Sequence, residues 1–346
     1  MGEGVSRERQ EPSRNPSQDD PFAEVATGAR RRLVAALDAE GALPDPAWRA
    51  AFADVPRHLF VPSYHVGTYG GYERLGRDDP APAARRRWLD GAYEDRPLGT
   101  LLRGGDLVST ASQPSLMADM LHALDVRDGD TVLEIGAGTG YNAALLSHRL
   151  GDTRVTTVDI DPDITDAARA RLHEAGYHPA VVTGDGARGC PDRAPFDRII
   201  ATCAVPSVPG AWLAQCRPGA RVVTPLSTGV LWLRVDDARH AEGRFLHTAA
   251  YFIPVRGTLP TPPEPRTGGL PRGALESELF RFLLTLASGA LDPYEAYALW
   301  QREGRPARER YGVTVRDGRQ WAWLDDPEGP YVWGVGGDGG IGIGIG

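Results

Sequence analysis

Between residues 131 and 226, short apolar runs rich in β-branched residues alternate with segments of helical length. This alternation is typical of βαβ units, in which successive strands pair in parallel and helices cover the sheet. We therefore predict an α/β fold with a central, mostly parallel sheet and helices on both faces. The expected strands are Thr131–Ile135, Val155–Ile160, Ala180–Thr183, Arg198–Cys203 and Arg221–Leu226, and the expected helices are Tyr141–Leu150, Ile164–Ala175 and Val208–Gln215.

Two later apolar runs, Val230–Val235 and His247–Val255, have no helical segment between them. Strands joined in this way pair antiparallel, so we expect a pair at one edge of the sheet. Further on, Leu275–Ala287 has apolar residues at helical spacing. Asp317-Gly318 lies between two strand-like runs and predicts a hairpin turn.

Composition divides the rest of the chain. The polar N-terminal segment predicts disorder, and a stretch dense in proline predicts a linker. A Gly-, Pro- and Arg-rich insertion is expected to be a long loop. The expected divisions are a disordered tail at 1–22, a main domain at 23–257 with a helical start and the loop insertion at 63–91, a linker at 258–272, a small α+β accessory module at 273–333 and a flexible Gly-rich tail at 334–346.

The most specific local signal is the segment Glu134–Tyr141 (EIGAGTGY), between an expected strand and an expected helix. Glycine lets the backbone approach a ligand closely, and a helix N-terminus offers free N–H groups. A dinucleotide site needs G-x-G-x-x-G, and here the third glycine comes one residue early. The spacing of Glu134, Gly136, Gly138 and Gly140 instead resembles motif I of S-adenosylmethionine-dependent methyltransferases. A structural turn and a nucleotide site remain the alternatives.

Acidic residues follow the next two expected strands. Asp159 can accept hydrogen bonds from both hydroxyls of a ribose. Asp161 is the fallback for that role, although a capping role before Pro162 suits it better. Asp185 could accept from an adenine amino group, with Gly186 leaving room for the ring, and a plain turn is the alternative. Because parallel strands end at one edge, these motifs are expected to meet there, as in a Rossmann-like class I S-adenosylmethionine-dependent methyltransferase.

Composition excludes several classes of function. All 38 cationic side chains are arginine, so Schiff-base lysines, pyridoxal phosphate enzymes and the lysine of a P-loop are ruled out. The net charge of −8 argues against bulk electrostatic binding to nucleic acid or to an anionic membrane. Cys190, Cys203 and Cys216 are too few and too far apart for a disulfide framework or a metal site. No apolar run reaches about 18 residues and no signal peptide is evident, so we expect a cytoplasmic protein without a metal.

Three segments ahead of the glycine motif resemble the protein-L-isoaspartate O-methyltransferase family. They are residues 55–62 (VPRHLFVP), 92–98 (AYEDRPL) and 110–114 (TASQP), and residues 194–200 (APFDRII) and 222–226 (VVTPL) are similar to later parts of the family. The resemblance extends from about Trp48 to Val255. It implies methyl transfer from S-adenosylmethionine to an aspartyl or isoaspartyl carboxylate, and an ester that collapses to a succinimide. By position, Ser112 would hydrogen-bond the substrate carboxylate or the cofactor, with Thr110 nearby.

Other features depart from that family. The connection from Pro62 to Ala92 is long, and many residues follow the core. These features, together with residues 88–90 (WLD), 112–117 (SQPSLM) and 310–315 (RYGVTV), resemble an actinobacterial subgroup that accompanies lanthipeptide and ATP-grasp (graspetide) maturation. This resemblance implies a modified precursor peptide as partner and an aspartimide or isoaspartate product. General repair of isoaspartyl proteins is the alternative function. A non-catalytic cofactor-binding protein and a nicotinamide dehydrogenase are weaker hypotheses, because the motif I spacing and Ser112 speak against them.

Overall fold

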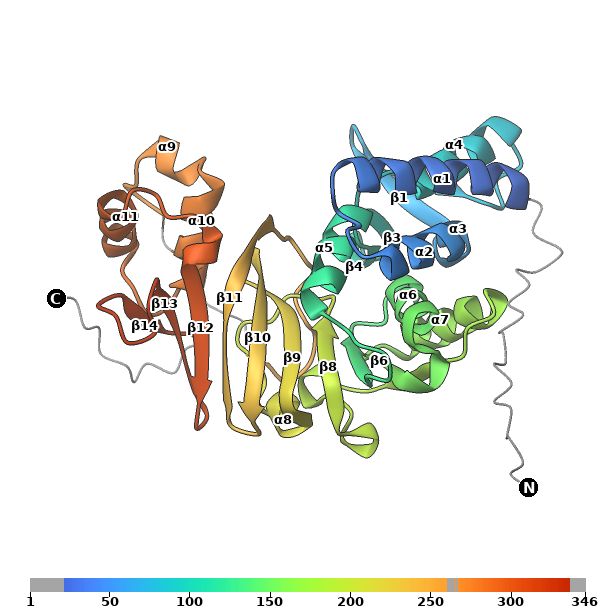
Figure 1. Cartoon of the computed structure of the whole chain (residues 1–346). Helices are drawn as coiled ribbons and strands as arrows, with labels where there is room; N and C mark the ends of the chain where they lie inside the picture. Colours follow the sequence, from blue (N-terminus) through green and yellow to red (C-terminus); the bar gives the residue numbers. More distant parts are fainter. Residues whose placement is uncertain (1–21, 260–264, 266, 337–346) are drawn as a thin grey trace, which may run out of the picture.

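The computed structural model describes residues 22–259, 265 and 267–336. In this part of the chain a ten-stranded sheet runs through the molecule, and a four-stranded antiparallel sheet lies beside it (Figure 1). The predicted tails lie outside the described residues, except for Phe22 and the segment 334–336. The same holds for most of the prolines of the predicted linker.

The parallel half of the large sheet confirms the predicted βαβ units. Its strands run in the order β9-β8-β5-β6-β7, and every neighbouring pair is parallel. The strands are β5 (Val132–Ile135), β6 (Val155–Asp159), β7 (Ala180–Thr183), β8 (Phe196–Ala201) and β9 (Cys216–Leu226), and the helices between them are α6 (Tyr141–Leu150), α7 (Pro162–Glu174) and the short α8 (Gly210–Ala214). All five C-terminal strand ends therefore meet at one edge.

The other half of the sheet is antiparallel and larger than predicted. It contains β10 (Gly229–Asp237), β11 (His240–Ala249), β12 (Tyr311–Arg316), β13 (Arg319–Leu324) and β14 (Val332–Gly334). The predicted bounds of the strand over His247–Val255 were wrong, because β11 begins at His240 and ends at Ala249. Asp237 makes the tight turn before it by accepting hydrogen bonds from the Arg239 N–H and the His240 ring. The pair also does not lie at an edge, since β12 pairs with β11.

The predicted C-terminal module thus shares its strands with the main sheet. Its helices are α9 (Arg272–Leu275), α10 (Glu278–Leu286) and α11 (Pro293–Arg302). α10 begins later than predicted because the Ser277 side chain caps it by accepting from the Phe280 N–H. Asp317 and Gly318 have φ angles of 53° and 79°, which fits the hairpin turn expected between β12 and β13.

The insertion at 63–91 is not a long loop. It forms the hairpin β1 (Ser63–Thr68) and β2 (Gly71–Gly76) and the helix α4 (Pro82–Ala92). Tyr64 and Trp88 explain the difference, because both are completely buried and fix these elements to the core. The Trp88 indole N–H also donates to the Val61 carbonyl at 2.8 Å. The many Gly, Pro and Arg residues around these two aromatic anchors concealed the hairpin and the helix.

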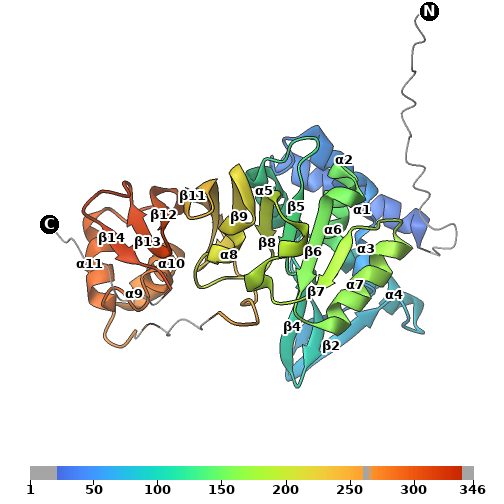
Figure 2. The same ribbon diagram turned by 90° about the horizontal axis from the view of Figure 1, so that it is seen from below.

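The remaining N-terminal elements surround the parallel half. They are α1 (Ala23–Ala39), α2 (Pro46–Asp54), α3 (Arg57–Phe60), β3 (Leu98–Arg103), β4 (Asp106–Ala111) and α5 (Pro114–Leu124), and the small sheet runs in the order β2-β1-β3-β4. Viewed from below, α6 and α7 lie on one side of the parallel strands, and β2 and β4 lie below them (Figure 2).

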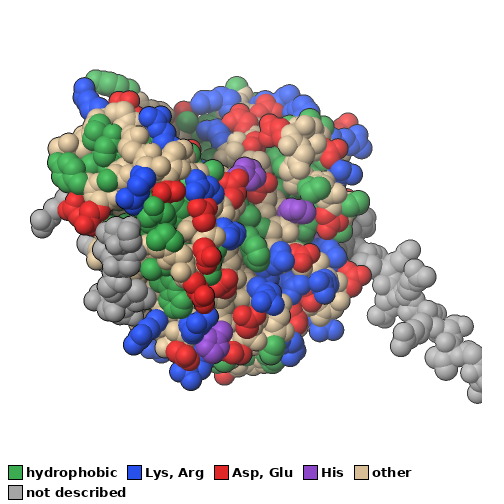
Figure 3. Space-filling view, turned by 60° about the vertical axis from the view of Figure 1, so that its left-hand side comes forward, with side chains coloured by type: hydrophobic (Ala, Val, Ile, Leu, Met, Phe, Trp, Pro, Cys, Tyr) green, Lys and Arg blue, Asp and Glu red, His purple; other side chains and the backbone are tan. Residues whose placement is uncertain are grey.

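Two hydrophobic clusters hold these layers together. One joins α1, α2, α5 and α6 to residues such as Val132 on one face of the sheet. The other joins α8, α10 and α11 to residues such as Leu133 on the opposite face. On the molecular face shown in Figure 3, acidic and basic side chains are interspersed. None of the helices in the described part of the chain has the length and apolar character needed to span a bilayer.

Candidate active site

A cavity lies where β4, β5, β6 and the segment after β11 converge. Its space, counted together with the solvent at its open mouth, is about 850 Å³. Predicted and unpredicted residues share its wall. The predicted ones are Thr110, Ser112, Glu134, Gly136, Gly138, Asp159 and Gly186, and the unpredicted ones include Ser109, Ile160, Ile164, Thr202, Cys203 and Arg256.

The glycine turn has the close approach that the sequence predicted. Gly136 and Gly138 have φ angles of 95° and 51°, which lie in the region that favours glycine. A Cβ on Gly136 would lie 2.8 Å from the Thr202 hydroxyl, so only glycine fits without a shift. Gly140 does not line the cavity. A Cβ there would come within 3.3 Å of Leu172, so this glycine lets α6 pack against α7.

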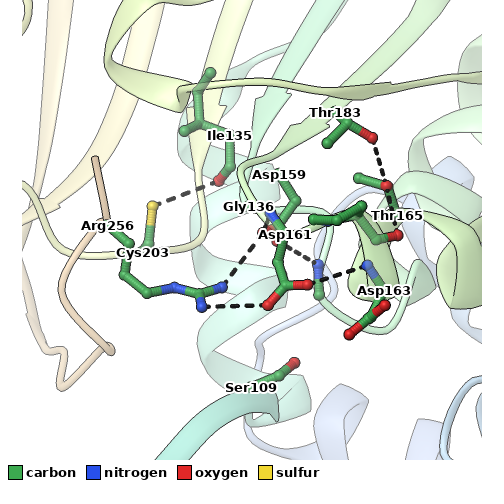
Figure 4. A network of polar contacts seen from close by, with 12 residues as sticks. Ser109, Ile135, Gly136, Asp159, Asp161, Asp163, Thr165, Thr183, Cys203 and Arg256 are labelled. Atoms are coloured by element: carbon green, nitrogen blue, oxygen red, sulfur yellow. Dashed lines mark hydrogen bonds and ion pairs between the residues drawn. The ribbon is translucent and has the colours of Figure 1, made fainter. Parts of the chain in front are cut away.

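Asp159 is held at the tip of β6 by its neighbours. Its carboxylate accepts hydrogen bonds from the Gly138 N–H at 3.3 Å and the Asp161 N–H at 3.2 Å. The Arg256 guanidinium lies 3.5 Å from it. The side chain is 10% exposed and faces the cavity. Figure 4 shows Arg256 pointing toward Asp159 and Asp161, with Ser109 on β4 near them.

Asp161 has the capping role that its position before Pro162 suggested. It caps α7 by accepting from the Asp163 N–H at 3.0 Å. It also accepts from Arg103, at the tip of the β3–β4 hairpin, and this hydrogen bond lowers the pKa of the Asp161 carboxyl. Asp161 does not line the cavity, so the structure favours Asp159 over it for a ligand.

Asp185 is not placed as predicted. Its carboxylate caps the turn that follows by accepting from the Ala187 N–H at 2.9 Å. It also accepts from the hydroxyl and the N–H of Thr258, at 2.8 and 3.2 Å. The carboxylate therefore faces this chain segment, and Asp185 does not line the cavity. The adjacent Gly186 does, and a Cβ on it would lie 2.6 Å from Ile135 at the end of β5.

The segment after β11 is a functional element that the sequence analysis missed. Residues 250–258, here called the strap, cross the strand tips after β11 ends. The Val255 N–H donates to the Ala204 carbonyl, and the Ala204 N–H donates to the Ile253 carbonyl. Arg256 and Thr258 then contact the carboxylates at the ends of β6 and β7. The local sequence of the strap does not predict its position, because that position depends on where β8 and β11 end.

Glu134 lies at the floor of the cavity and is completely buried. Its Oε1 accepts from the Asn142 side chain at 2.8 Å, while Oε2 has no partner within the described residues. Burial raises the pKa of the Glu134 carboxyl from 4.5 to about 7. The first acidic residue of the motif is therefore a group whose charge changes near neutral pH.

Ser112, predicted to bind the substrate carboxylate or the cofactor, and the nearby Thr110 line the same cavity as the glycine turn. A Cβ on Gly138 would lie 3.6 Å from the Thr110 carbonyl, so the two segments are in contact. Thr110 belongs to β4, and Ser112 follows it. Ser112 lies in the short link before α5, and both line the cavity. The 110–114 segment thus meets motif I, as the order of motifs suggested.

The thiol of Cys203 also lies in the wall of the cavity. Burial, together with the charges of Asp159 and Glu134, raises the pKa of the Cys203 thiol to about 12. A thiol is a weak nucleophile unless it is ionised, so this side chain stays unreactive toward an electrophile at neutral pH.

These residues fit S-adenosylmethionine. The turn at Gly136 and Gly138 forms a cradle that a Cβ would fill, and the Asp159 carboxylate can accept from vicinal hydroxyls. Ile160 and Ile164 provide apolar surface beside it for a flat ring. The described residues contain no group of three or more His, Cys, Asp or Glu side chains placed to bind a metal.

We expect Asp159→Asn to weaken binding of S-adenosylhomocysteine about 10- to 100-fold, because a charge-assisted hydrogen bond to the ribose is lost. Isothermal titration calorimetry measures this change. Asp163→Asn is the matched control, since Asp163 is 81% exposed and pairs only with Arg103 among the ion pairs found here. Equal affinities for the two variants would contradict the role of Asp159.

Glu134→Gln should stabilise the ligand-free protein in a pH-dependent way. Between pH 4.5 and about 7 the folded protein holds more protons at Glu134 than the unfolded chain does, so the free energy of unfolding falls as the pH rises. Glutamine does not ionise, so the variant does not lose this free energy of unfolding. The free energy of unfolding of the variant should exceed that of the wild type only slightly at pH 4.5 and by about 3 kcal/mol above pH 7. Urea denaturation measures it, with the exposed Glu276→Gln as control. A pH-independent difference would contradict the assignment.

The chain matches known proteins over the same region. Residues 80–256, about half of the chain, match the family described as Protein-L-isoaspartate(D-aspartate) O-methyltransferase (PCMT). The protein-L-isoaspartate O-methyltransferase of Methanopyrus kandleri is 36% identical over 237 residues, which cover 66% of this chain and 92% of that protein. That of Hyperthermus butylicus is 36% identical over 242 residues, covering 66% of this chain and 89% of that protein.

Solved structures agree in fold. A protein-L-isoaspartate O-methyltransferase has a TM-score of 0.58 at 23% identity, covering 83% of this chain and 96% of that one. A putative one from Plasmodium falciparum, in complex with S-adenosyl-L-homocysteine, has a TM-score of 0.50 at 12% identity and covers 66% of this chain and 98% of that one. Because the match to the family covers half of the chain and its relatives align over about nine-tenths of their length, the chain belongs to the protein-L-isoaspartate(D-aspartate) O-methyltransferase family, whose members are S-adenosylmethionine-dependent carboxyl O-methyltransferases.

Proposed function

We propose that this chain methylates the free carboxylate of an isoaspartyl residue in a protein or peptide, with S-adenosylmethionine as the donor. One observation carries the proposal: Ser112 and Thr110 lie in the same cavity as the glycine turn and Asp159. A carboxylate that reaches Ser112 is therefore within the space that also accommodates the donor.

The chemistry asks little of the protein side chains. Bound S-adenosylmethionine supplies a methyl group on a sulfonium, which is a good leaving group. The acceptor is a carboxylate with an ordinary pKa near 4, so it is already ionised and needs no general base. The chain's part is to orient the acceptor through the Ser112 hydroxyl and to exclude water with apolar walls such as Val108 and Ile253. The neutral Cys203 thiol does not compete for the methyl group.

The ester is a reactive product. The backbone amide nitrogen that follows the modified residue attacks the ester carbonyl, its proton is lost, and methanol leaves as the five-membered succinimide closes. Water then opens the ring to an aspartyl or isoaspartyl residue. Repeated cycles of this kind convert isoaspartyl residues back to aspartyl residues, which is a repair function.

A second candidate acceptor is a normal aspartyl residue in a modified, ribosomally made peptide, which would end as an aspartimide. The observation that favours it is the structure on either side of the residues that match the family model. The hairpin β1–β2 precedes the matched residues 80–256, and α10, α11 and β12–β14 follow them. Tyr69 and Tyr72 of the hairpin are exposed and available to a peptide, whereas Tyr64 is buried.

Two synthetic peptides that differ only in one residue, isoaspartyl or aspartyl, separate the candidates. The repair function predicts that only the isoaspartyl peptide gains the mass of one methylene in the presence of S-adenosylmethionine, and later loses methanol. Methylation of the aspartyl peptide alone would favour the second candidate. Transfer to neither peptide, nor to a constrained cyclic peptide carrying aspartate, would contradict carboxyl methylation by this chain.

Ser112→Ala should lower kcat about 100-fold, because the hydroxyl that holds the acceptor carboxylate is lost. The affinity for S-adenosylhomocysteine should stay within about threefold, since the cofactor contacts proposed above remain. Single-turnover methylation and calorimetry measure the two quantities. Ser63→Ala is the control, because Ser63 does not line the cavity. Near wild-type turnover by Ser112→Ala would contradict its role.

A further inference from the structure

Arg57 is a completely buried cation behind the site. The acceptors of its hydrogen bonds within the described chain are all backbone carbonyl oxygens, and none is a carboxylate. They belong to Ala92, to Glu94 and Arg96 at 3.4 Å, and to Ser112 at 3.1 Å. Burial lowers the pKa of the Arg57 guanidinium, which reflects the cost of keeping the charge away from water. A charge kept at such a cost needs a reason beyond filling space.

The four carbonyls come from two distant parts of the chain. Three lie at and just after the C-terminal end of α4, where the helix dipole favours a cation. The fourth belongs to Ser112, in the link between β4 and α5. Arg57 therefore connects the link that carries the Ser112 hydroxyl to the turn at 92–96.

The other end of the same link is held by the same turn. Asp95 accepts from the Ser115 N–H at 2.8 Å and from the Gln113 side chain at 3.0 Å, so it caps the start of α5. Ser112 and Gln113 themselves belong to no helix or strand. Their position depends on Arg57 on one side and Asp95 on the other.

We propose that Arg57 is a positioning residue for the methyl acceptor, acting through the carbonyl of Ser112 to hold the Ser112 hydroxyl toward the cavity. The proposal rests on the function proposed above. A planar guanidinium is needed because its five donors spread in fixed directions and reach several carbonyls at once. A lysine ammonium is a single point and cannot span both Ser112 and the turn at 92–96.

A double-mutant cycle with an acceptor peptide tests this proposal. Arg57→Lys should lower kcat at least about tenfold while the affinity for S-adenosylhomocysteine stays within about threefold. In the Ser112→Ala background the same change should have almost no further effect, because the hydroxyl that Arg57 positions is already absent. Independent effects that multiply in the double variant would overturn the proposal.

Arg308→Lys is the matched control. Arg308 is also buried, at 4% exposed, and donates to a backbone carbonyl, that of His247; it also lies 3.5 Å from the Glu278 carboxylate. It does not line the cavity, so kcat should stay within about twofold of the wild type. An equal loss of kcat in Arg308→Lys and Arg57→Lys would mean that any buried arginine has this effect, and would overturn the proposal. If Arg57→Lys does not fold, Arg57→Gln takes its place.

Amide hydrogen exchange tests the proposal without any activity. In Arg57→Lys, the Ser115 amide and its neighbours at 112–116 should exchange at least about tenfold faster than in the wild type, whereas α10, which Arg57 does not contact, should be unchanged. Unchanged exchange at 112–116 would overturn the positioning role. If the wild type methylates no peptide, the proposed function fails, and the exchange result still decides whether Arg57 orders the Ser112 link.

Discussion

Parallel pairing of β9, β8, β5, β6 and β7 is the constraint on which the site depends. It brings the ends of strands that are distant in the sequence to one edge, where the glycine turn and Asp159 lie on neighbouring strands. The polar backbone and side-chain groups at each strand end then need hydrogen-bond partners. The chain supplies them from two directions, with β4 and the Ser112 link on one side and the strap on the other.

The three upstream motifs that resemble the family form one physical unit. Arg57 lies in the first, the carbonyls it bonds and Asp95 lie in the second, and Ser112 lies in the third. A single cluster of hydrogen bonds thus joins the three segments, which are separate in the sequence. Ser112 of this cluster and the glycines of motif I line the same cavity. Three motifs that are separate in the sequence therefore act together to hold the segment that carries Ser112.

The sequence predicted what depends on local pattern. The parallel strands, the glycine turn and the position of Asp159 follow from periodicity and motif spacing, whereas Ser112 follows from the resemblance to the family. The structure places the turn, Asp159 and Ser112 in the wall of one cavity. It did not predict what depends on tertiary contacts. The turn of Asp185 toward Thr258, the strap with Arg256 and the hairpin at 63–76, which pairs with β3, all depend on residues far away in the chain. The start of β11 was missed because a short turn at Asp237 leaves little trace in hydropathy.

The sharing of one sheet by the family region and the C-terminal strands has a consequence for how the molecule can be divided. Composition alone marks the proline-rich stretch as a natural place to cut. A chain cut there would leave the N–H and C=O groups along β11 without the partners that β12 provides. An unpaired edge strand of this kind can pair with a strand of another molecule, so the shortened protein would tend to self-associate. The family region and the C-terminal strands thus share one continuous sheet, so a cut between them would leave a sheet edge of each part unpaired.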